Sequence, residues 1–246
     1  MHQFFVSAEQ IREKEVLILG SDVNHIRNVL RMECGEEICV SNGQDNREYR
    51  CRIEQIDQEQ IRAGILWVEE VGLELPSQIY LFQGLPKGDK MELIIQKAVE
   101  LGAFQIIPVA TRRAVVKLDG KKAQNKCRRW NGISESAAKQ SKRMVIPQVT
   151  EVMTFAQALE YAAKLDVKLI PYELAKEMKE TRRVLGEIKP GQSVGIFIGP
   201  EGGFEEEEIR QAMEIGAKPI TLGKRILRTE TAGMATLAIL MYYLEP

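Results

Sequence analysis

The chain reads Ile198-Gly-Pro-Glu-Gly-Gly-Phe204 between an apolar run typical of a buried strand and a charged run typical of a helix. Glycines at such a connection let the backbone approach a ligand closely, at the sheet edge where α/β proteins bind their ligands. The spacing is neither the G-x-G-x-x-G of a dinucleotide site nor a P-loop, because no Gly-Lys-Ser/Thr follows. Taken alone, the stretch fits a tight strand-to-helix connection better than a binding loop.

A second strand end has the same character and reads Leu222-Gly-Lys-Arg-Ile-Leu-Arg-Thr-Glu-Thr-Ala232. We expect Thr229 to cap the helix that follows, so part of this stretch is ordinary helix initiation. Arg228 is different, because a guanidinium beside an apolar helix start suits a phosphate or a developing negative charge on a base. The apolar run at residues 234–243 is expected in the core or at a subunit interface rather than against a cofactor.

Residues 78–246 alternate buried strands with amphipathic helices, which predicts a mainly parallel sheet covered on both faces. Four glutamates at residues 205–208 open one helix and suit the positive end of its dipole. The expected strands are 78–83, 105–109, 167–171, 193–198 and 219–222, and the expected helices are 90–101, 121–140, 155–164, 205–215 and 229–244.

The first part of the chain consists of short strand-like runs, and a turn-prone linker at residues 72–77 ends it. One helix interrupts the strands, with Ser21 or Asp22 as its expected N-cap. We therefore expect two domains, a small closed or half-closed β domain at residues 1–72 and an α/β domain at residues 73–246. The expected strands of the first domain are 3–6, 16–19, 37–40, 49–56 and 61–70.

The composition bounds the classes of function. The 246 residues are 44% hydrophobic, enough to fill such cores. The four cysteines are scattered, without a C-x-x-C pair or a neighbouring histidine, and no carboxylate cluster suggests metal catalysis. No Ser/His/Asp or Cys/His arrangement supports nucleophilic hydrolysis. Without a signal-peptide pattern or an apolar run of membrane-spanning length, we expect a cytoplasmic protein with no bound metal and no membrane partner.

The formal net charge of -1 argues mildly against a nucleic-acid partner, but the cations are unevenly distributed. Residues 112–143 hold eleven cations and two anions, which fits a nucleic-acid-binding strip and a solvated helix face about equally. Smaller basic clusters lie at residues 25–31, 87–90 and 138–143. A lone histidine such as His25 is more often a structural residue than a base.

Together these stretches resemble the RsmE-type 16S ribosomal RNA uridine-N3 methyltransferases of the SPOUT superfamily. The resemblance covers nearly the whole chain, with several spaced motifs in the family's order. It rests on His25-Ile-Arg-Asn-Val-Leu-Arg-Met32, Lys87-Gly-Asp-Lys-Met-Glu92, Ile95-Gln-Lys-Ala-Val-Glu-Leu-Gly102, Val116-Lys-Leu-Asp119, and the stretches 198–204 and 222–231.

The resemblance implies a PUA-like β-barrel that binds RNA, followed by a SPOUT α/β domain whose carboxyl-terminal part forms a trefoil knot. It implies a homodimer, with residues 234–243 at the interface, that acts on 16S ribosomal RNA in the decoding region of the assembled small subunit. S-adenosylmethionine would lie bent within the knot. The implied cofactor-binding residues are Tyr172, Glu173, Ile198, Gly199, Pro200, Glu201, Gly202, Gly203, Leu222, Gly223, Ile226 and Leu227.

Methylation at N3 of uridine requires loss of the N3 proton, and the charge spreads over N3 and the two carbonyl oxygens. We expect Arg228 to stabilise that charge and Glu230 to accept the proton. The residues expected to contact RNA lie in the basic clusters and in the 112–143 strip. They are His25, Arg27, Arg31, Lys87, Lys90, Arg113, Lys117, Lys139, Lys142 and Arg143.

Four positions differ from the family pattern: Gln3 replaces an arginine, Lys139 a glutamate, Lys142 a small residue and Lys224 a proline.

Two alternative functions remain. Related knotted enzymes methylate the 2'-oxygen of ribose, and mass spectrometry of nucleosides separates that product from a methylated base. A ribosome-binding or assembly factor without turnover would bind RNA but incorporate no methyl group.

Overall fold

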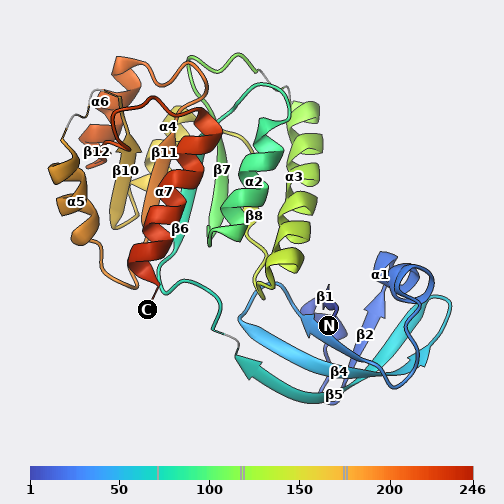
Figure 1. Cartoon of the computed structure of the whole chain (residues 1–246). Helices are drawn as coiled ribbons and strands as arrows, with labels where there is room; N and C mark the ends of the chain where they lie inside the picture. Colours follow the sequence, from blue (N-terminus) through green and yellow to red (C-terminus); the bar gives the residue numbers. More distant parts are fainter. Residues whose placement is uncertain (71, 117, 119, 174, 176, 246) are drawn as a thin grey trace. The chain divides into compact units, whose positions relative to one another are not determined.

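The computed structural model of the chain describes residues 1–70, 72–116, 118, 120–173, 175 and 177–245 (Figure 1). The contacts between residues divide the chain into two compact units. The β unit comprises Met1–Glu74 and Ala138–Ile146, and the α/β unit comprises Leu75–Ala137 and Pro147–Pro246. Lys117, one of the residues expected to contact RNA, lies outside the described residues.

The β unit is built on one five-stranded sheet in the order β1-β3-β4-β5-β2. β4 and β5 are long and curved (Figure 1), and two register shifts between them produce local bends. Alternate side chains of the strands point inward and form one buried apolar cluster. The prediction of a half-closed β domain is confirmed. The strands are β1 (Gln3–Phe5), β2 (Glu15–Leu19), β3 (Glu37–Ser41), β4 (Arg47–Ile56) and β5 (Gln60–Glu70).

The predicted helix of the β unit has two parts. α1 (Ser21–Asn24) continues directly into a π-helical segment, η2 (His25–Leu30), and a short 3-10 turn, η1 (Ala8–Gln10), lies earlier in the chain. The predicted N-cap at Ser21 or Asp22 is wrong, because the helix begins at Ser21 and its N-cap is Gly20, without a side-chain hydrogen bond. The serine hydroxyl therefore does not start this helix.

A segment distant in sequence joins the β unit. The side chain of Gln3 donates to the carbonyl of Arg143 over 2.9 Å, and the hydroxyl of Ser41 donates to the carbonyl of Met144 over 2.8 Å. The backbone N–H of Ile146 donates to the carbonyl of Gly43. These bonds attach the end of one helix and the following turn to the first strands.

The α/β unit contains a parallel sheet in the order β12-β10-β11-β6-β7-β8, with β9 pairing beside β7. The predicted parallel sheet is thereby confirmed. Because its strands are parallel, their carboxyl ends meet at one edge. The strands are β6 (Ile79–Gly84), β7 (Gln105–Ala110), β8 (Gln148–Val149), β9 (Met153–Thr154), β10 (Val167–Pro171), β11 (Val194–Ile198) and β12 (Lys218–Ile220).

Helices cover both faces of this sheet, with α2 and α7 on the near side in Figure 1 and α4 on the far side. The five predicted helices are present, but α5 was not predicted. Within its nine residues only Thr181, Val184 and Leu185 are buried. Its apolar stripe is therefore short, and the charged residues around it mask the helical periodicity in the sequence. The helices are α2 (Lys90–Glu100), α3 (Gly120–Ser141), α4 (Phe155–Ala162), α5 (Met178–Gly186), α6 (Glu206–Glu214) and α7 (Thr229–Leu244).

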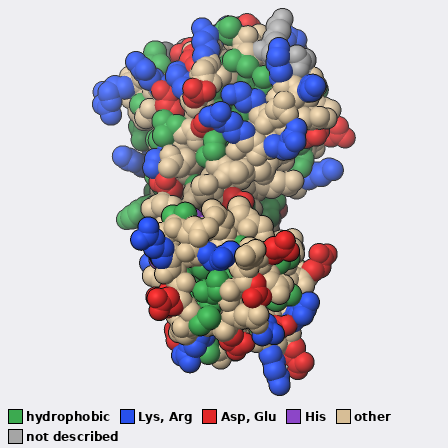
Figure 2. Space-filling view, turned by 90° about the vertical axis from the view of Figure 1, so that its right-hand side faces the viewer, with side chains coloured by type: hydrophobic (Ala, Val, Ile, Leu, Met, Phe, Trp, Pro, Cys, Tyr) green, Lys and Arg blue, Asp and Glu red, His purple; other side chains and the backbone are tan. Residues whose placement is uncertain are grey.

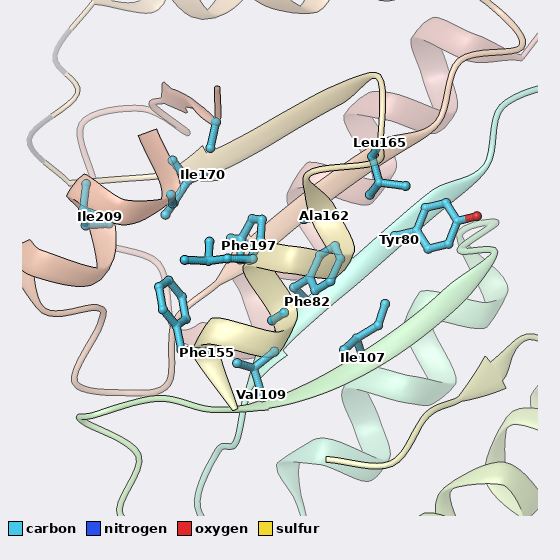
Figure 3. Packing of buried hydrophobic residues seen from close by; sticks show 14 residues of the cluster. Tyr80, Phe82, Ile107, Val109, Phe155, Ala162, Leu165, Ile170, Phe197 and Ile209 are labelled. Carbon is cyan, nitrogen blue, oxygen red and sulfur yellow. The ribbon is translucent and has the colours of Figure 1, made fainter. Parts of the chain in front are cut away.

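Aromatic side chains fix the two central strands to each other (Figure 3). The rings of Phe82 on β6 and Phe197 on β11 stack with centroids 4.6 Å apart, and both residues are fully buried. Phe155 of α4 meets Phe197 edge-on at 6.2 Å. Ile209 of α6 belongs to the same cluster. This packing holds the carboxyl ends of β6 and β11 at fixed positions, which matters because the functional site begins there.

We predict that Phe197→Ala lowers the free energy of unfolding by about 3–5 kcal/mol, because it removes a buried ring and leaves a cavity between two strands. Chemical denaturation followed by circular dichroism measures this change. Leu93→Ala is the matched control, since Leu93 of α2 is 43% exposed and should change stability by less than about 0.5 kcal/mol. Equal losses in the two variants would contradict the assignment of this core.

Candidate functional site

A cavity of about 520 Å³ opens at the carboxyl edge of the parallel sheet. Its walls come from the chain segments that follow β10, β11 and β12, and this size lies in the usual range for small-molecule sites. Every residue expected to bind the cofactor lines it, together with Arg228. These lining residues are Tyr172, Glu173, Ile198, Gly199, Pro200, Glu201, Gly202, Gly203, Leu222, Gly223, Ile226 and Leu227.

The first wall is the turn after β11, and it is unusually compact. A Cβ atom on Gly199 would lie 3.0 Å from both Cα and the carbonyl carbon of Gly203. The N–H of Gly203 donates to the carbonyl of Pro200 over 2.9 Å, which closes the turn. On the neighbouring strand, a Cβ on Gly84 would lie 2.6 Å from Cδ of Pro200. Glycine is therefore required at Gly84, and a side chain at Gly199 would have to push the backbone of Gly203 aside.

Arg113 holds this turn from outside. Its guanidinium donates to the carbonyl of Gly202 over 3.0 Å and to the carboxylate of Glu205 over 2.8 and 3.2 Å. The sequence suggested RNA contact for Arg113, which stays a prediction. The structure places Arg113 on the wall of the cavity, where three of its N–H donors bind Gly202 and Glu205. A planar guanidinium suits this task because it donates in several directions at once.

The start of α6 explains the four glutamates. Glu205 is the N-cap, and its backbone N–H donates to the carboxylate of Glu208 over 2.9 Å. Glu208 is 2% exposed and also accepts from the N–H of Arg112 over 2.9 Å. These contacts confirm the helix-start reading of the acidic run, which stabilises the helix by its charge as well as its hydrogen bonds.

The second wall is the segment between β12 and α7. The hydroxyl of Thr221 accepts from the N–H of Gly223 over 3.2 Å and bends the chain there. In the ranges that the structure describes, the backbone N–H groups of residues 224–227 donate no hydrogen bond. Ile226 is 86% exposed, although its side chain is apolar. Unused backbone donors and an exposed apolar side chain on a cavity wall both suit a bound organic molecule.

α7 begins at this wall, and one sequence-based expectation about it is wrong. The N-cap is Arg228, not Thr229, and Thr229 is the first helical residue. The Thr229 hydroxyl instead donates to the carbonyl of Gly199 over 2.6 Å and accepts from the side chain of Gln83 over 2.9 Å. A tertiary partner thus replaces the local capping bond. Gln83 was not singled out from the sequence, although a glutamine inside an apolar strand just before a glycine was a signal.

Arg228 lines the cavity, and no ion pair engages it among the described residues. Glu230, the second residue of α7, is not part of the cavity lining, and its side chain is 15% exposed. The two residues expected to share the chemistry therefore lie at the same helix end, with the guanidinium at the cavity and the carboxylate beside it.

Lys90 connects Glu230 to the first wall. Its ammonium lies 2.8 Å from the carboxylate of Glu201 and 3.6 Å from that of Glu230. The N–H of Lys87 also donates to Glu201 over 3.1 Å. Burial alone would raise the pKa of Glu201, but the bonds from Lys90 and Lys87 and the charge of Lys90 hold that pKa below its ordinary value. Both lysines were expected to contact RNA, which stays a prediction; within the protein, Lys90 pairs with the carboxylates of Glu201 and Glu230.

The other residues expected to contact RNA lie in the β unit. Arg27 reaches the carbonyl of Gln58 over 3.4 Å, and Lys139 lies 3.7 Å from Asp22. His25 stands edge-on to Phe4, Arg31 and Lys142 occupy left-handed backbone turns, and the Arg143 side chain is 6% exposed and paired with Glu74. Arg143 thus has a structural partner already.

Two absences hold for the described part of the chain. It contains no group of three or more His, Cys, Asp or Glu side chains that could hold a metal ion. None of its helices has both the length and the apolar character needed to cross a bilayer.

Comparisons with known proteins bear on the same regions. The RNA methyltransferase domain family matches residues 73–241, and the RNA methyltransferase PUA domain family matches residues 18–66. Ribosomal RNA small subunit methyltransferase E of Bacillus subtilis is 39% identical, over 100% of this chain and 98% of its own length. The protein of that name from Mesomycoplasma hyopneumoniae is 35% identical, over 95% and 96% of the two chains.

A solved structure is also similar. It is the crystal structure of a ribosomal RNA small subunit methyltransferase E from Neisseria gonorrhoeae bound to S-adenosyl methionine. It is 32% identical to this chain and superimposes with a TM-score of 0.84, over 98% of this chain and 97% of its own.

We predict that Lys90→Met raises the pKa of Glu201, because it removes a hydrogen bond and a positive charge from the carboxylate. A carboxyl-carbon NMR titration, assigned with Glu201→Gln, measures this. The lowered pKa means that the contribution of Glu201 to stability is present above its unfolded pKa of about 4.3 and is lost as pH falls through the folded value. Lys97→Met is the control, since Lys97 pairs with Glu100 on the same helix. An unchanged Glu201 pKa in Lys90→Met would refute the assigned cause.

Proposed function

This chain belongs to the ribosomal RNA small subunit methyltransferase E family, and from that premise we propose that it transfers a methyl group from S-adenosylmethionine to small-subunit ribosomal RNA. The observation that carries the proposal is the convergence of the turn after β11 and the segment before α7 on one cavity. Both walls belong to the part of the chain that the RNA methyltransferase domain family matches.

The residues of the cavity fit S-adenosylmethionine. The free backbone N–H groups of residues 224–227 can pair with the edge of an adenine, and the apolar side chains of Ile198, Leu222 and Ile226 can flank its faces. Because Gly199 has no side chain, the turn that forms the first wall can fold closely against Gly203. S-adenosylmethionine supplies an electrophilic methyl group on its sulfonium centre.

We propose N3 of a uridine in 16S ribosomal RNA, in the decoding region, as the acceptor. The chain must hold that nitrogen in line with the methyl group, about 3–3.5 Å away, because such positioning provides much of the acceleration. Arg228, on the cavity wall, stabilises the charge that spreads over the base when the N3 proton leaves. Glu230 accepts that proton, and Lys90 at 3.6 Å keeps its carboxylate oriented beside the cavity.

RNA must be gripped outside the cavity, because the target base has to leave its stack at a cost of about a few kcal/mol. We propose that the basic residues of the β unit and the cationic helix α3 supply this grip through phosphate contacts. Figure 2 shows Lys and Arg side chains across the α/β unit on the side that carries α3, among fewer Asp and Glu side chains. The division into an RNA-binding part at residues 1–72 and a catalytic part at residues 73–246 stays a proposal.

Three further features belong to the same proposal. The segment from β10 to α7 forms a trefoil knot, as in SPOUT enzymes, and the knot folds the two cavity walls together. The protein acts as a cytoplasmic homodimer on the assembled small subunit. On α7, Tyr242 and Tyr243 are 82% and 50% exposed, which supports an interface at residues 234–243.

We predict that purified protein, labelled S-adenosylmethionine and undermodified small subunits yield 3-methyluridine in 16S ribosomal RNA. Mass spectrometry of nucleosides, followed by mapping of the labelled fragment, detects it. Formation of 2'-O-methylated nucleosides instead would favour the ribose methyltransferase. Binding to the subunits without incorporation of label would favour the assembly factor.

We predict that Gly199→Trp abolishes binding of S-adenosylmethionine, because its Cβ would meet Gly203 at 3.0 Å and the large indole would force apart the turn that forms the first wall. Isothermal titration calorimetry measures the loss. Gly186→Trp is the matched control, because Gly186 is exposed at the end of α5 with open space around it. Unchanged affinity in Gly199→Trp would remove this turn from the site.

A further inference from the structure

Gln83 is a polar residue in a strand whose other side chains are mostly apolar. It lies on β6, paired with Ile198 of β11 on one side and with Pro108 of β7 on the other, and it is fully buried. Its neighbours on the strand, Leu81 and Phe82, are typical core residues. A glutamine buried there loses its hydrogen bonds to water, and bonds to protein groups must replace them.

Hydrogen bonds define the orientation of the Gln83 amide. Its nitrogen donates to the carbonyl of Gly84 over 2.9 Å and to the hydroxyl oxygen of Thr229 over 2.9 Å. The single proton of that hydroxyl is used in the 2.6 Å bond to the carbonyl of Gly199. The hydroxyl must therefore accept from Gln83, and both carbonyls can only accept. The nitrogen, not the oxygen, faces Thr229.

This orientation leaves the amide oxygen of Gln83 without a hydrogen-bond partner among the described residues. It faces α7 near Gly233, where an added Cβ would lie 3.7 Å away. A buried acceptor without a partner costs stability, and a methionine would fill the same space without that cost. Packing alone does not account for the glutamine, so its bonds to Thr229 and Gly84 must.

We propose that Gln83 and Thr229 are positioning residues for the methyl donor. Through one chain of hydrogen bonds, Gln83 fixes the first residue of α7, and Thr229 fixes the carbonyl of Gly199 at the start of the opposite cavity wall. Gln83, which is buried and does not line the cavity, thereby sets the distance between the turn after β11 and Arg228. The inference rests on the proposed function, because it names what the cavity holds.

The same chain of bonds explains why Gln83 precedes Gly84. Gly84 lets Pro200 approach the strand, and its carbonyl receives the second bond of the Gln83 amide. The strand end thus contacts the turn twice, once through the close backbone approach and once through Thr229. Loss of the amide would leave the close approach and the bond from Thr229 to Gly199, but the Thr229 hydroxyl would lose the donor that orients it and would hold the carbonyl of Gly199 less firmly.

The test uses the full chain with Gln83→Met, which removes the bonds of the amide to Gly84 and Thr229, and Thr229→Val, which removes the bonds of the hydroxyl with Gln83 and Gly199. Both variants nearly keep the side-chain size. We expect S-adenosylmethionine to bind each variant about tenfold more weakly or worse by isothermal titration calorimetry, since small misplacements of a site are costly. Without ligand, the thermal midpoint of Gln83→Met should equal or exceed that of the original protein, because the unpaired oxygen is gone. If the glutamine served folding alone, Gln83→Met would keep the affinity for S-adenosylmethionine and lower the thermal midpoint.

Hydrogen exchange gives a second reading that needs no ligand. The amide of Gly203, which donates to Pro200, should exchange faster in both variants because the turn is less restrained. Thr236→Val is the matched control. Thr236 is 1% exposed on the same helix, but its hydroxyl bonds to the carbonyl of Ala232 in its own helix and to no other described residue, so this variant should keep the donor affinity.

The outcomes separate the two levels of inference. If the original protein binds S-adenosylmethionine and both variants bind it equally well, the positioning role is overturned and the proposed function stands. If the original protein does not bind S-adenosylmethionine, both are overturned. Should Gln83→Met fail to fold, Thr229→Val, which loses only a hydroxyl, decides by the same affinity and exchange measurements.

Discussion

The close approach of the turn after β11 to the end of β6 is the constraint on which the rest of the site depends. Pro200 comes so near to Gly84 that no side chain fits there, and Gly199 is folded tightly, though less so, against Gly203. Stacking of Phe82 on Phe197 holds the two strands that present this turn. Because the strands are parallel, the segments after β10 and β12 reach the same edge, and a cavity forms between them.

The charged side chains around the cavity have two roles: some bind groups of the protein, and one is directed at the cavity. Arg113 and Lys90 line the cavity and use donors on groups of the protein, one carbonyl and three carboxylates. Arg228 faces the cavity with its donors unused by the described protein groups, which is what a residue that meets developing charge requires. The formal net charge of -1 conceals this arrangement, because acidic residues balance the cations over the whole chain but not within residues 112–143.

Much of this organisation was predictable from the amino-acid sequence, because periodicity reports burial and glycine reports close backbone approach. The parallel sheet, five of its helices and the cavity residues followed from apolar runs, two glycine-bearing strand ends and a family resemblance. The partner of Thr229 did not, because its hydroxyl bonds to Gly199, thirty positions away, instead of to its own helix. Helix α5 was not predicted either, because only three of its nine residues are buried and its apolar stripe is short. The helix after β2 was predicted, but the π-helical form of its second part, η2, was not.

A crystal structure of the protein soaked or grown with S-adenosylmethionine tests the central claim most directly. The account predicts density for the ligand between the turn at Ile198–Phe204 and the segment at Leu222–Leu227, with its methyl group open toward Arg228. Density for the ligand at any other place on the α/β unit, with the two walls in contact and no room between them, would contradict it.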